Sequence, residues 1–178
     1  MYFKTSYSSP IGMITLACEG DNLVGLWMEE QKYFGGTVDE EMVEASELPI
    51  LEATKKWLDR YFNGEKPEIS ELSLAPIGGE FRQAVWKILC EIPYGETTTY
   101  GAIAKEIAKK FGKEKMAAQA VGGAVGHNPI SIIIPCHRVV GTNGGLVGYG
   151  GGLDIKVKLL TLEGVPMENF TSDVFFNR

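Results

Sequence analysis

The chain is poor in the residues that build disulfide frameworks and metal centres. Only three cysteines occur among 178 residues, Cys18, Cys90 and Cys136, and their scattered positions fit no disulfide framework. A reducing, intracellular setting is therefore expected. The two histidines, His127 and His137, leave no ligand spacing for structural zinc, so we expect no metal.

Long hydrophobic runs are also missing, and none approaches the ~20 residues that cross a bilayer. Residues 1–12 contain no basic segment followed by an apolar one, so we expect no signal peptide and no membrane partner. There is no low-complexity tract and no internal repeat. A length of 178 residues suits one domain or two small ones.

Positive charge is scarce and unevenly placed. The net charge is −6, but residues 1–77 carry 6 Lys and Arg against 14 Asp and Glu, whereas residues 78–178 carry 11 against 9. A simple nucleic-acid binder is disfavoured, and any contact with phosphates belongs to the second part and is modest in strength. The lysines within residues 105–115 either serve such a contact or only solvate a helix, and charge alone leaves both open.

The first part of the chain contains three short β-type runs, residues 2–7, 13–18 and 23–28, separated by turn-forming residues. These runs predict an antiparallel meander. After the acidic segment 38–47, residues 48–64 predict a helix with an apolar face that covers the sheet. That face consists of Ile50, Thr54, Trp57, Leu58, Tyr61 and Phe62.

The best domain boundary lies in residues 65–79, which contain two prolines and end on two glycines. We therefore predict an α/β (α+β) protein with an N-terminal support domain at residues 1–77 and a second domain at residues 78–178.

The second domain is expected to be mainly helical. Apolar residues recur at helical spacing in residues 80–92, 100–111 and 117–125. Pro93 stops the first segment, and the threonines of residues 97–99 offer an N-cap for the second. Two short helices joined by a tight turn, after a supporting helix, have the outline of a helix-turn-helix, although such a pair is also a common packing unit.

The last of these helices has almost only small side chains. Gly122 and Gly123 in a helix interior cost ~1 kcal/mol each relative to alanine. Two explanations stay open: the helix packs closely against a neighbour, or a bulky surface such as a nucleic-acid groove approaches its backbone. Gln119 is its one long polar side chain and falls off the apolar stripe toward solvent.

Cys136 and His137 stand together after an apolar run, and we expect a loop, a buried strand and then a break at Pro135. In a continuing strand the two side chains would point to opposite faces, whereas a turn lets thiol and imidazole share a proton. A buried thiol is only slightly ionised at neutral pH, so a reactive cysteine needs a neighbouring base. The alternative is an inert apolar cysteine, and the chemistry alone leaves both open.

Four further motifs occur in chain order: IPYGETTTYGAIA at 92–104, NP at 128–129, PCHRVV at 135–140 and GGLDIKVKLLTLEG at 151–164. Together they resemble one family, the O6-alkylguanine-DNA alkyltransferases. The resemblance covers residues 79–164, and residues 8–27 resemble the N-terminal domain of that family. It implies a ribonuclease-H-like N-terminal domain and a winged helix-turn-helix in the second domain.

The resemblance implies a suicide reaction in which one protein accepts one alkyl group from damaged DNA. Cys136 is then the acceptor, and His137 deprotonates it through a water. Glu163 holds the imidazole and stabilises its positive form. Tyr100 gives a proton to the guanine ring as it leaves.

The same resemblance implies a pocket for the flipped guanine. Asn128 braces the cysteine loop by backbone hydrogen bonds, and Val139 and Tyr149 line the pocket. Gly150 stands where many relatives carry a serine, and Ser131 lies in the segment before the cysteine, so we expect both to influence which alkyl groups fit.

For DNA, the resemblance implies that the second helix of the pair enters the minor groove and that its small residues permit this approach. Gln119 departs from the family pattern, which usually has an arginine there that fills the gap left by the flipped base. Arg138 is assigned either to structure or to a phosphate contact. The residues expected at the DNA are Thr99, Gln119, Ala120, Gly122, Gly123 and Arg138.

The function implied is irreversible, stoichiometric repair of O6-alkylguanine in double-stranded DNA, by a cytoplasmic, nucleoid-associated monomer without a cofactor. Whether O4-alkylthymine is also accepted stays open. Three alternatives remain: a lesion sensor that binds without transfer, a thiol hydrolase using Cys136 and His137, and a transcription factor built on the helix pair.

Overall fold

The computed structural model describes residues 1–145 and 152–166, and the chain divides into two compact units. The first unit contains Met1–Gly78 and also Pro129–Ile133, and the second contains Gly79–Asn128 and the residues from Ile134 onward. This division differs from the contiguous second domain expected at 78–178, because the short internal segment Pro129–Ile133 belongs to the first unit. In the described ranges, no helix is long and apolar enough to cross a membrane.

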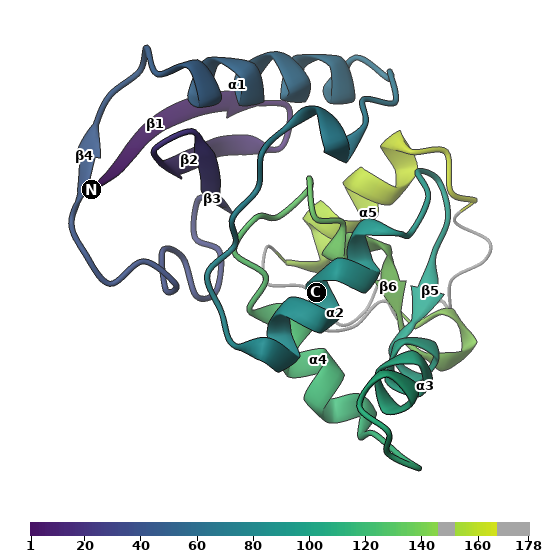
Figure 1. Ribbon diagram of the computed structural model, residues 1–178. Helices are drawn as coiled ribbons and strands as arrows, with labels where there is room; N and C mark the ends of the chain where they lie inside the picture. Colours follow the sequence, from purple (N-terminus) through teal and green to yellow (C-terminus); the bar gives the residue numbers. More distant parts are fainter. Residues whose placement is uncertain (146–151, 167–178) are drawn as a thin grey trace. The chain divides into compact units, whose positions relative to one another are not determined.

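The first unit is built on a four-stranded sheet (Figure 1). Strands β1 (Tyr2–Ser9), β2 (Gly12–Glu19) and β3 (Asn22–Met28) pair antiparallel in sequence order, which confirms the predicted meander. Strand β4 (Met42–Glu44) adds to β1 in parallel and gives the order β3-β2-β1-β4. This fourth strand was not predicted, because it lies within the acidic segment 38–47, which has the composition of a solvated loop.

The internal segment Pro129–Ile133 joins the first unit along β3. The Leu26 amide donates to the Pro129 carbonyl at 2.8 Å, and the Ser131 amide donates to the Leu26 carbonyl at 3.1 Å. A sheet edge offers unpaired backbone groups, so a passing segment satisfies them without needing a strand of its own. Hydrophobic spacing along the chain carries no signal for such a pairing.

Helix α1 (Pro49–Phe62) packs on the sheet of the first unit (Figure 1). Its buried face is close to the predicted one, except that Leu51 is buried and Phe62 is half-buried. Gly25 in β3 is required by packing, because a Cβ there would lie 2.1 Å from the ring of Trp27. The sheet, Trp27 and α1 together give this unit a core of its own.

The second unit is mainly helical, as predicted. Its elements are α2 (Glu80–Cys90), β5 (Thr98–Thr99), α3 (Tyr100–Lys110), α4 (Ala118–Gly126), β6 (Val139–Val140) and α5 (Leu153–Leu162). Helices α2, α3 and α4 pack on one another, and the indole of Trp86 in α2 donates to the Ala124 carbonyl of α4 at 2.8 Å. The short strands β5 and β6 pair in parallel and join the start of α3 to the segment after Cys136.

Candidate active site and DNA-binding helices

The segment before Cys136 turns instead of forming the predicted buried strand. Ile132 has a φ of 71°, in the left-handed region that β-branched residues rarely adopt. The Ile133 amide donates to the Ser131 carbonyl and the Cys136 amide to the Ile134 carbonyl, both at 2.8 Å. These tight bonds replace a strand ladder. The apolar run predicted burial correctly, but burial alone does not specify an extended backbone.

A single 3-10 turn, Cys136–Arg138, carries the three polar residues of the motif. All three are buried, with His137 completely inaccessible to solvent. The side-chain amide of Asn128 donates to the Ile134 carbonyl at 2.8 Å, so it braces the chain two residues before Cys136. This bond is of the kind that the resemblance implies for Asn128.

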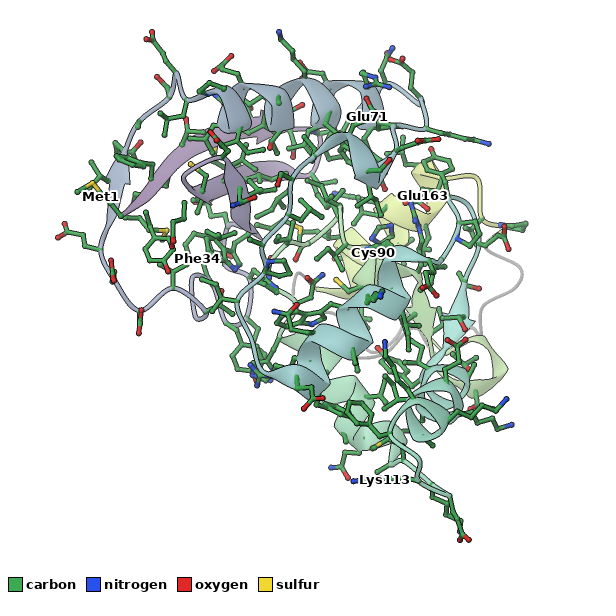
Figure 2. The ribbon with its side chains drawn as sticks, viewed as in Figure 1. Met1, Phe34, Glu71, Cys90, Lys113 and Glu163 are labelled. Atoms are coloured by element: carbon green, nitrogen blue, oxygen red, sulfur yellow. The ribbon has the colours of Figure 1, made fainter. Side chains whose placement is uncertain are left out.

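The imidazole of His137 is oriented by Glu163, which follows α5 and is labelled in Figure 2. His137 Nε2 donates to Glu163 Oε2 at 2.5 Å, and both side chains are fully buried. Because the carboxylate accepts at Nε2, the neutral imidazole carries its proton there and leaves Nδ1 as the basic nitrogen. Among the described residues, His137 Nδ1 is buried without a hydrogen-bond partner.

Glu163 accepts three further hydrogen bonds. Arg138 donates from Nε to Oε1 at 2.7 Å and from Nη2 to Oε2 at 3.2 Å, and the Gly95 amide donates to Oε1 at 3.1 Å. Burial alone would raise the pKa of the Glu163 carboxyl, but the bonds from His137 and Arg138 outweigh it and hold the pKa far below its usual range. Glu163 is therefore an anion at any physiological pH.

Burial lowers the pKa of His137, and the positive charges of Arg138 and Lys156 lower it further, against the opposing effect of Glu163. His137 is thus a neutral imidazole at neutral pH, with a free nitrogen able to accept a proton. A neutral base of this kind, held by a carboxylate, is the arrangement that activates a neighbouring nucleophile.

Arg138 lies in the interior and not at the surface. Besides its fork on Glu163, it donates from Nη1 to the Ile92 carbonyl at 2.8 Å and lies over the Tyr94 ring at 5.7 Å. Of the two roles predicted for Arg138, these contacts support the structural one and give no support to the phosphate contact. Its place in the PCHRVV motif gave no sign of which role applies, because a 3-10 turn and not a strand sets the direction of its side chain.

Tyr100 begins α3 and lies within electrostatic reach of Cys136. Burial, together with the charge of the nearby cysteine, raises the pKa of Tyr100 to about 12. The phenol is therefore protonated at neutral pH and able to donate. This agrees with the proton-donor role that the resemblance implies.

Lys156 is a member of the site that sequence reasoning missed. Its side chain is completely buried, and Nζ donates to the Val139 carbonyl at 2.6 Å. Burial lowers the pKa of Lys156 to about 8, although Cys136 opposes this. A signal was present: Lys156 precedes the buried Leu159 and Leu160 by three and four residues, which places it on their face of the helix.

The other residues predicted for the guanine pocket are Ser131, Val139, Tyr149 and Gly150. Ser131 belongs to the first unit, where its hydroxyl donates to Gln31 Oε1 at 3.3 Å, so the structure gives no support to its role in substrate binding. Tyr149 and Gly150 lie outside the described residues. Val139, in contrast, is buried directly after the 3-10 turn that contains Cys136.

Helices α3 and α4 form the predicted pair of short helices joined by a turn, with Lys113 in that turn (Figure 2). Thr99 caps α3, since its hydroxyl accepts from the Ala102 amide at 3.0 Å. On α4, Gln119 and Ala120 are exposed, which agrees with the expectation that they contact DNA.

Gly122 and Gly123 bear on the two explanations left open for α4. Among the described residues, a Cβ at Gly122 would meet the Tyr100 ring at an ordinary 3.9 Å, and one at Gly123 would meet nothing within 4 Å. Packing among the described residues therefore does not require glycine at either position. The approach of an outside surface to the backbone of α4 stays a prediction.

Comparison with known proteins gives concordant matches along the chain. The family model described as "6-O-methylguanine DNA methyltransferase, DNA binding domain" matches residues 80–165. The model described as "6-O-methylguanine DNA methyltransferase, ribonuclease-like domain" matches residues 2–76. The two matches fall on the predicted helical and support domains respectively.

Individual relatives show the same similarity. The methylated-DNA–protein-cysteine methyltransferase of Methanosarcina acetivorans is 48% identical over 92% of this chain and 99% of its own length. The protein of the same name from Haemophilus influenzae is 42% identical over 92% and 87%. The crystal structure of Mycobacterium tuberculosis OGT in complex with DNA is 42% identical, covers 99% of both chains and superposes with a TM-score of 0.76.

Proposed function

Because this chain belongs to the 6-O-methylguanine DNA methyltransferase family, we propose that it repairs O6-alkylguanine in double-stranded DNA by one irreversible transfer of the alkyl group to Cys136. The observation that carries the proposal is the buried turn that joins Cys136 to His137, with His137 fixed on Glu163 at 2.5 Å. Nucleophile, base and orienting carboxylate follow one another as in other activated nucleophiles.

The first step removes the thiol proton of Cys136. His137 Nδ1 accepts it through a water, since the other ring nitrogen already donates to Glu163. The imidazolium that forms is stabilised by the Glu163 anion beside it. The thiolate then has a lone pair available in a site from which bulk water is excluded.

In the transfer itself, the sulfur of Cys136 forms a bond to the alkyl carbon while the bond from that carbon to O6 breaks. The electron pair of the broken bond stays with guanine. Tyr100 gives its phenolic proton to the guanine ring, and the imidazolium of His137 returns a proton to the phenolate. Guanine leaves neutral, and no net proton is gained or lost.

The product accounts for a single turnover. A thioester has a carbonyl that water can attack, but an alkyl thioether has none. The bond between Cys136 and the alkyl carbon therefore persists, and one protein molecule repairs one lesion. This distinguishes the proposal from a thiol hydrolase, which must regenerate its cysteine.

DNA is proposed to meet the exposed side of α4. The base has to leave the stack to reach a buried thiol, at a cost of a few kcal/mol. Gly122 and Gly123 allow a groove to approach the α4 backbone, and Tyr100 packs beside Gly122, which links the DNA face to the reactive centre. The small positive excess of residues 78–178 agrees with modest electrostatic affinity.

Intact-protein mass spectrometry tests the proposal. After incubation with a duplex that carries one O6-methylguanine, the protein is expected to gain a single methyl group, mapped by peptide analysis to Cys136. A lesion sensor would bind the duplex without a gain in mass. A hydrolase would release product repeatedly from unmodified protein, and either of these outcomes would contradict the proposal.

Gln119 offers a test of the DNA face. Gln119→Arg is expected to tighten binding to the lesion duplex or to accelerate transfer by about fivefold, because a charged donor makes hydrogen bonds that are stronger by ~1 kcal/mol. Equilibrium binding and single-turnover rates measure the two effects. Gln83→Arg on the exposed side of α2 adds the same charge elsewhere in this unit and is the matched control. If both variants equal the wild type, Gln119 does not face the DNA.

A further inference from the structure

Arg138 has a set of contacts that the transfer reaction, as described, does not use. Its guanidinium makes two bonds to Glu163, at 2.7 and 3.2 Å, although Glu163 needs only one oxygen to orient His137. A paired carboxylate and imidazole in a buried site favour the charged imidazolium. An imidazole that is already protonated cannot take the thiol proton, so the site has to oppose that charge. Burial opposes it first, and a neighbouring positive charge adds to the effect of burial.

Resting on the function proposed above, we propose that Arg138 is a positioning residue that balances the charge of Glu163, so that His137 stays neutral until Cys136 releases its proton. Arginine suits this task because its guanidinium stays charged when buried and fits both carboxylate oxygens at once. The balance leaves the imidazole oriented but uncharged.

The guanidinium is itself held in place from the turn that follows α2. The Ile92 carbonyl accepts from Arg138 Nη1 at 2.8 Å, and the ring of Tyr94 lies under the guanidinium. The Gly95 amide donates to Glu163 Oε1 at 3.1 Å. Gly95 has a φ of +79°, and a Cβ there would lie 3.0 Å from the Glu163 carbonyl, so this close approach requires glycine. The PYG part of the family motif thus supports the carboxylate.

Several elements place charged or titratable groups around the pair of Glu163 and His137. Among them, Arg138 is the cation bonded to Glu163, whereas Lys156 donates to the Val139 carbonyl. The positive charge of Arg138 is also among the causes that lower the pKa of His137. Among the residues that the structure describes, the other titratable groups near this cluster are Cys136 on the same turn, Lys156 on α5, Tyr94 in the turn after α2, Cys90 on α2 and Tyr100 at the start of α3.

Without Arg138, Glu163 and His137 together would carry a negative charge in a buried site. They would take up a proton at neutral pH, and His137 would lose its capacity as a base. A residue with a purely structural role would not change the pH at which transfer begins. The pH dependence of the transfer rate therefore distinguishes the two roles.

The experiment compares single-turnover methyl transfer in wild type, Arg138→Met and Arg138→Lys between about pH 5 and 9, on a duplex with one O6-methylguanine. In Arg138→Met the acidic limb of the rate profile is expected to move up by about one pH unit or more, with a rate at least about tenfold lower near pH 6. Arg138→Lys keeps the charge and should leave the limb where the wild type has it. Arg60→Met removes an exposed Arg–Glu pair and should change nothing.

If the acidic limb of the rate profile of Arg138→Met lies at the same pH as that of the wild type, the inference is overturned. Weaker DNA binding with a shallower salt dependence as the sole change would also overturn it, because that is the signature of a phosphate contact. If the wild type itself accepts no methyl group, the proposed function fails, and a measurement without substrate then decides the role of Arg138.

That measurement is 15N NMR of protein labelled at the histidine ring nitrogens. The sequence contains two histidines, His127 and His137, so the spectrum reports on these two rings. At about pH 6.5 the wild type and Arg138→Lys should show a neutral His137 with its proton on Nε2, and Arg138→Met should show an imidazolium. Should Arg138→Met fail to fold, wild type and Arg138→Lys still decide the matter. A charged His137 in either would contradict the inference.

Discussion

Replacing Cys136 with serine is expected to abolish methyl acceptance completely while DNA binding stays within about twofold of the wild type. A serine hydroxyl is a far weaker acid than a thiol, and the pKa of His137 is already lowered by burial, so this imidazole cannot ionise it. The exchange of sulfur for oxygen is small in volume. Cys136 is also buried, so the exposed face of α4 keeps its shape.

The measurement is the mass of the intact protein after reaction, together with binding to the same duplex. Cys90→Ser and Cys18→Ala are the matched controls and should keep full acceptance. Burial raises the pKa of both thiols, that of Cys90 to about 11. Neither thiol belongs to a catalytic turn. A methyl group mapped to Cys18 or Cys90, or acceptance by the serine variant, would show that Cys136 is not the acceptor.

The regular elements could be predicted because their signals are local. Alternation and turn residues define β1 to β3, and apolar spacing defines the helices from α1 to α4. Thr99 is a cap that lies one residue before its helix and satisfies an amide three residues later. In each case the residues that make the structure are within a few positions of one another.

The failures share the opposite cause. Strand β4 depends on the edge of β1, some 40 residues away in the chain, and not on its own composition. The turn before Cys136 depends on Asn128 and on pairing with β3, which together override the preference of an isoleucine run for extended backbone. The buried position of Arg138 depends on its hydrogen bond to Glu163, which lies 25 residues later in the chain. Contacts between residues so far apart in the sequence produce no periodic pattern from which they could be predicted.

Glu163→Gln is expected to lower the free energy of unfolding of the second unit by about 3–5 kcal/mol, because it leaves a buried arginine without its counter-charge. The four bonds that Glu163 accepts explain the size of this loss: two N–H donors meet each carboxylate oxygen. An amide has a single acceptor oxygen. In either orientation its NH2 group therefore faces two donors, and transfer should slow by about a hundredfold or more as His137 loses its fixed orientation.

Thermal unfolding as a function of pH measures the loss. A fall in midpoint of at least about 12 °C is expected near neutral pH, because 1 kcal/mol corresponds to about 4–8 °C in a unit of this size. Since the pKa of Glu163 is lowered on folding, its contribution is fully present above the ordinary carboxyl value of 4.5 and is lost as the pH falls further. The difference in unfolding midpoint between wild type and variant should thus be constant near neutral pH and become smaller in acid.

Glu71→Gln is the matched control, since Glu71 also accepts two hydrogen bonds from an arginine, Arg60, and one from a backbone amide. It does so at the surface, where water can replace a lost partner, and its midpoint should hardly change. Equal losses in the two variants would mean that the burial of Glu163, and with it the electrostatics assigned to the catalytic turn, is wrong.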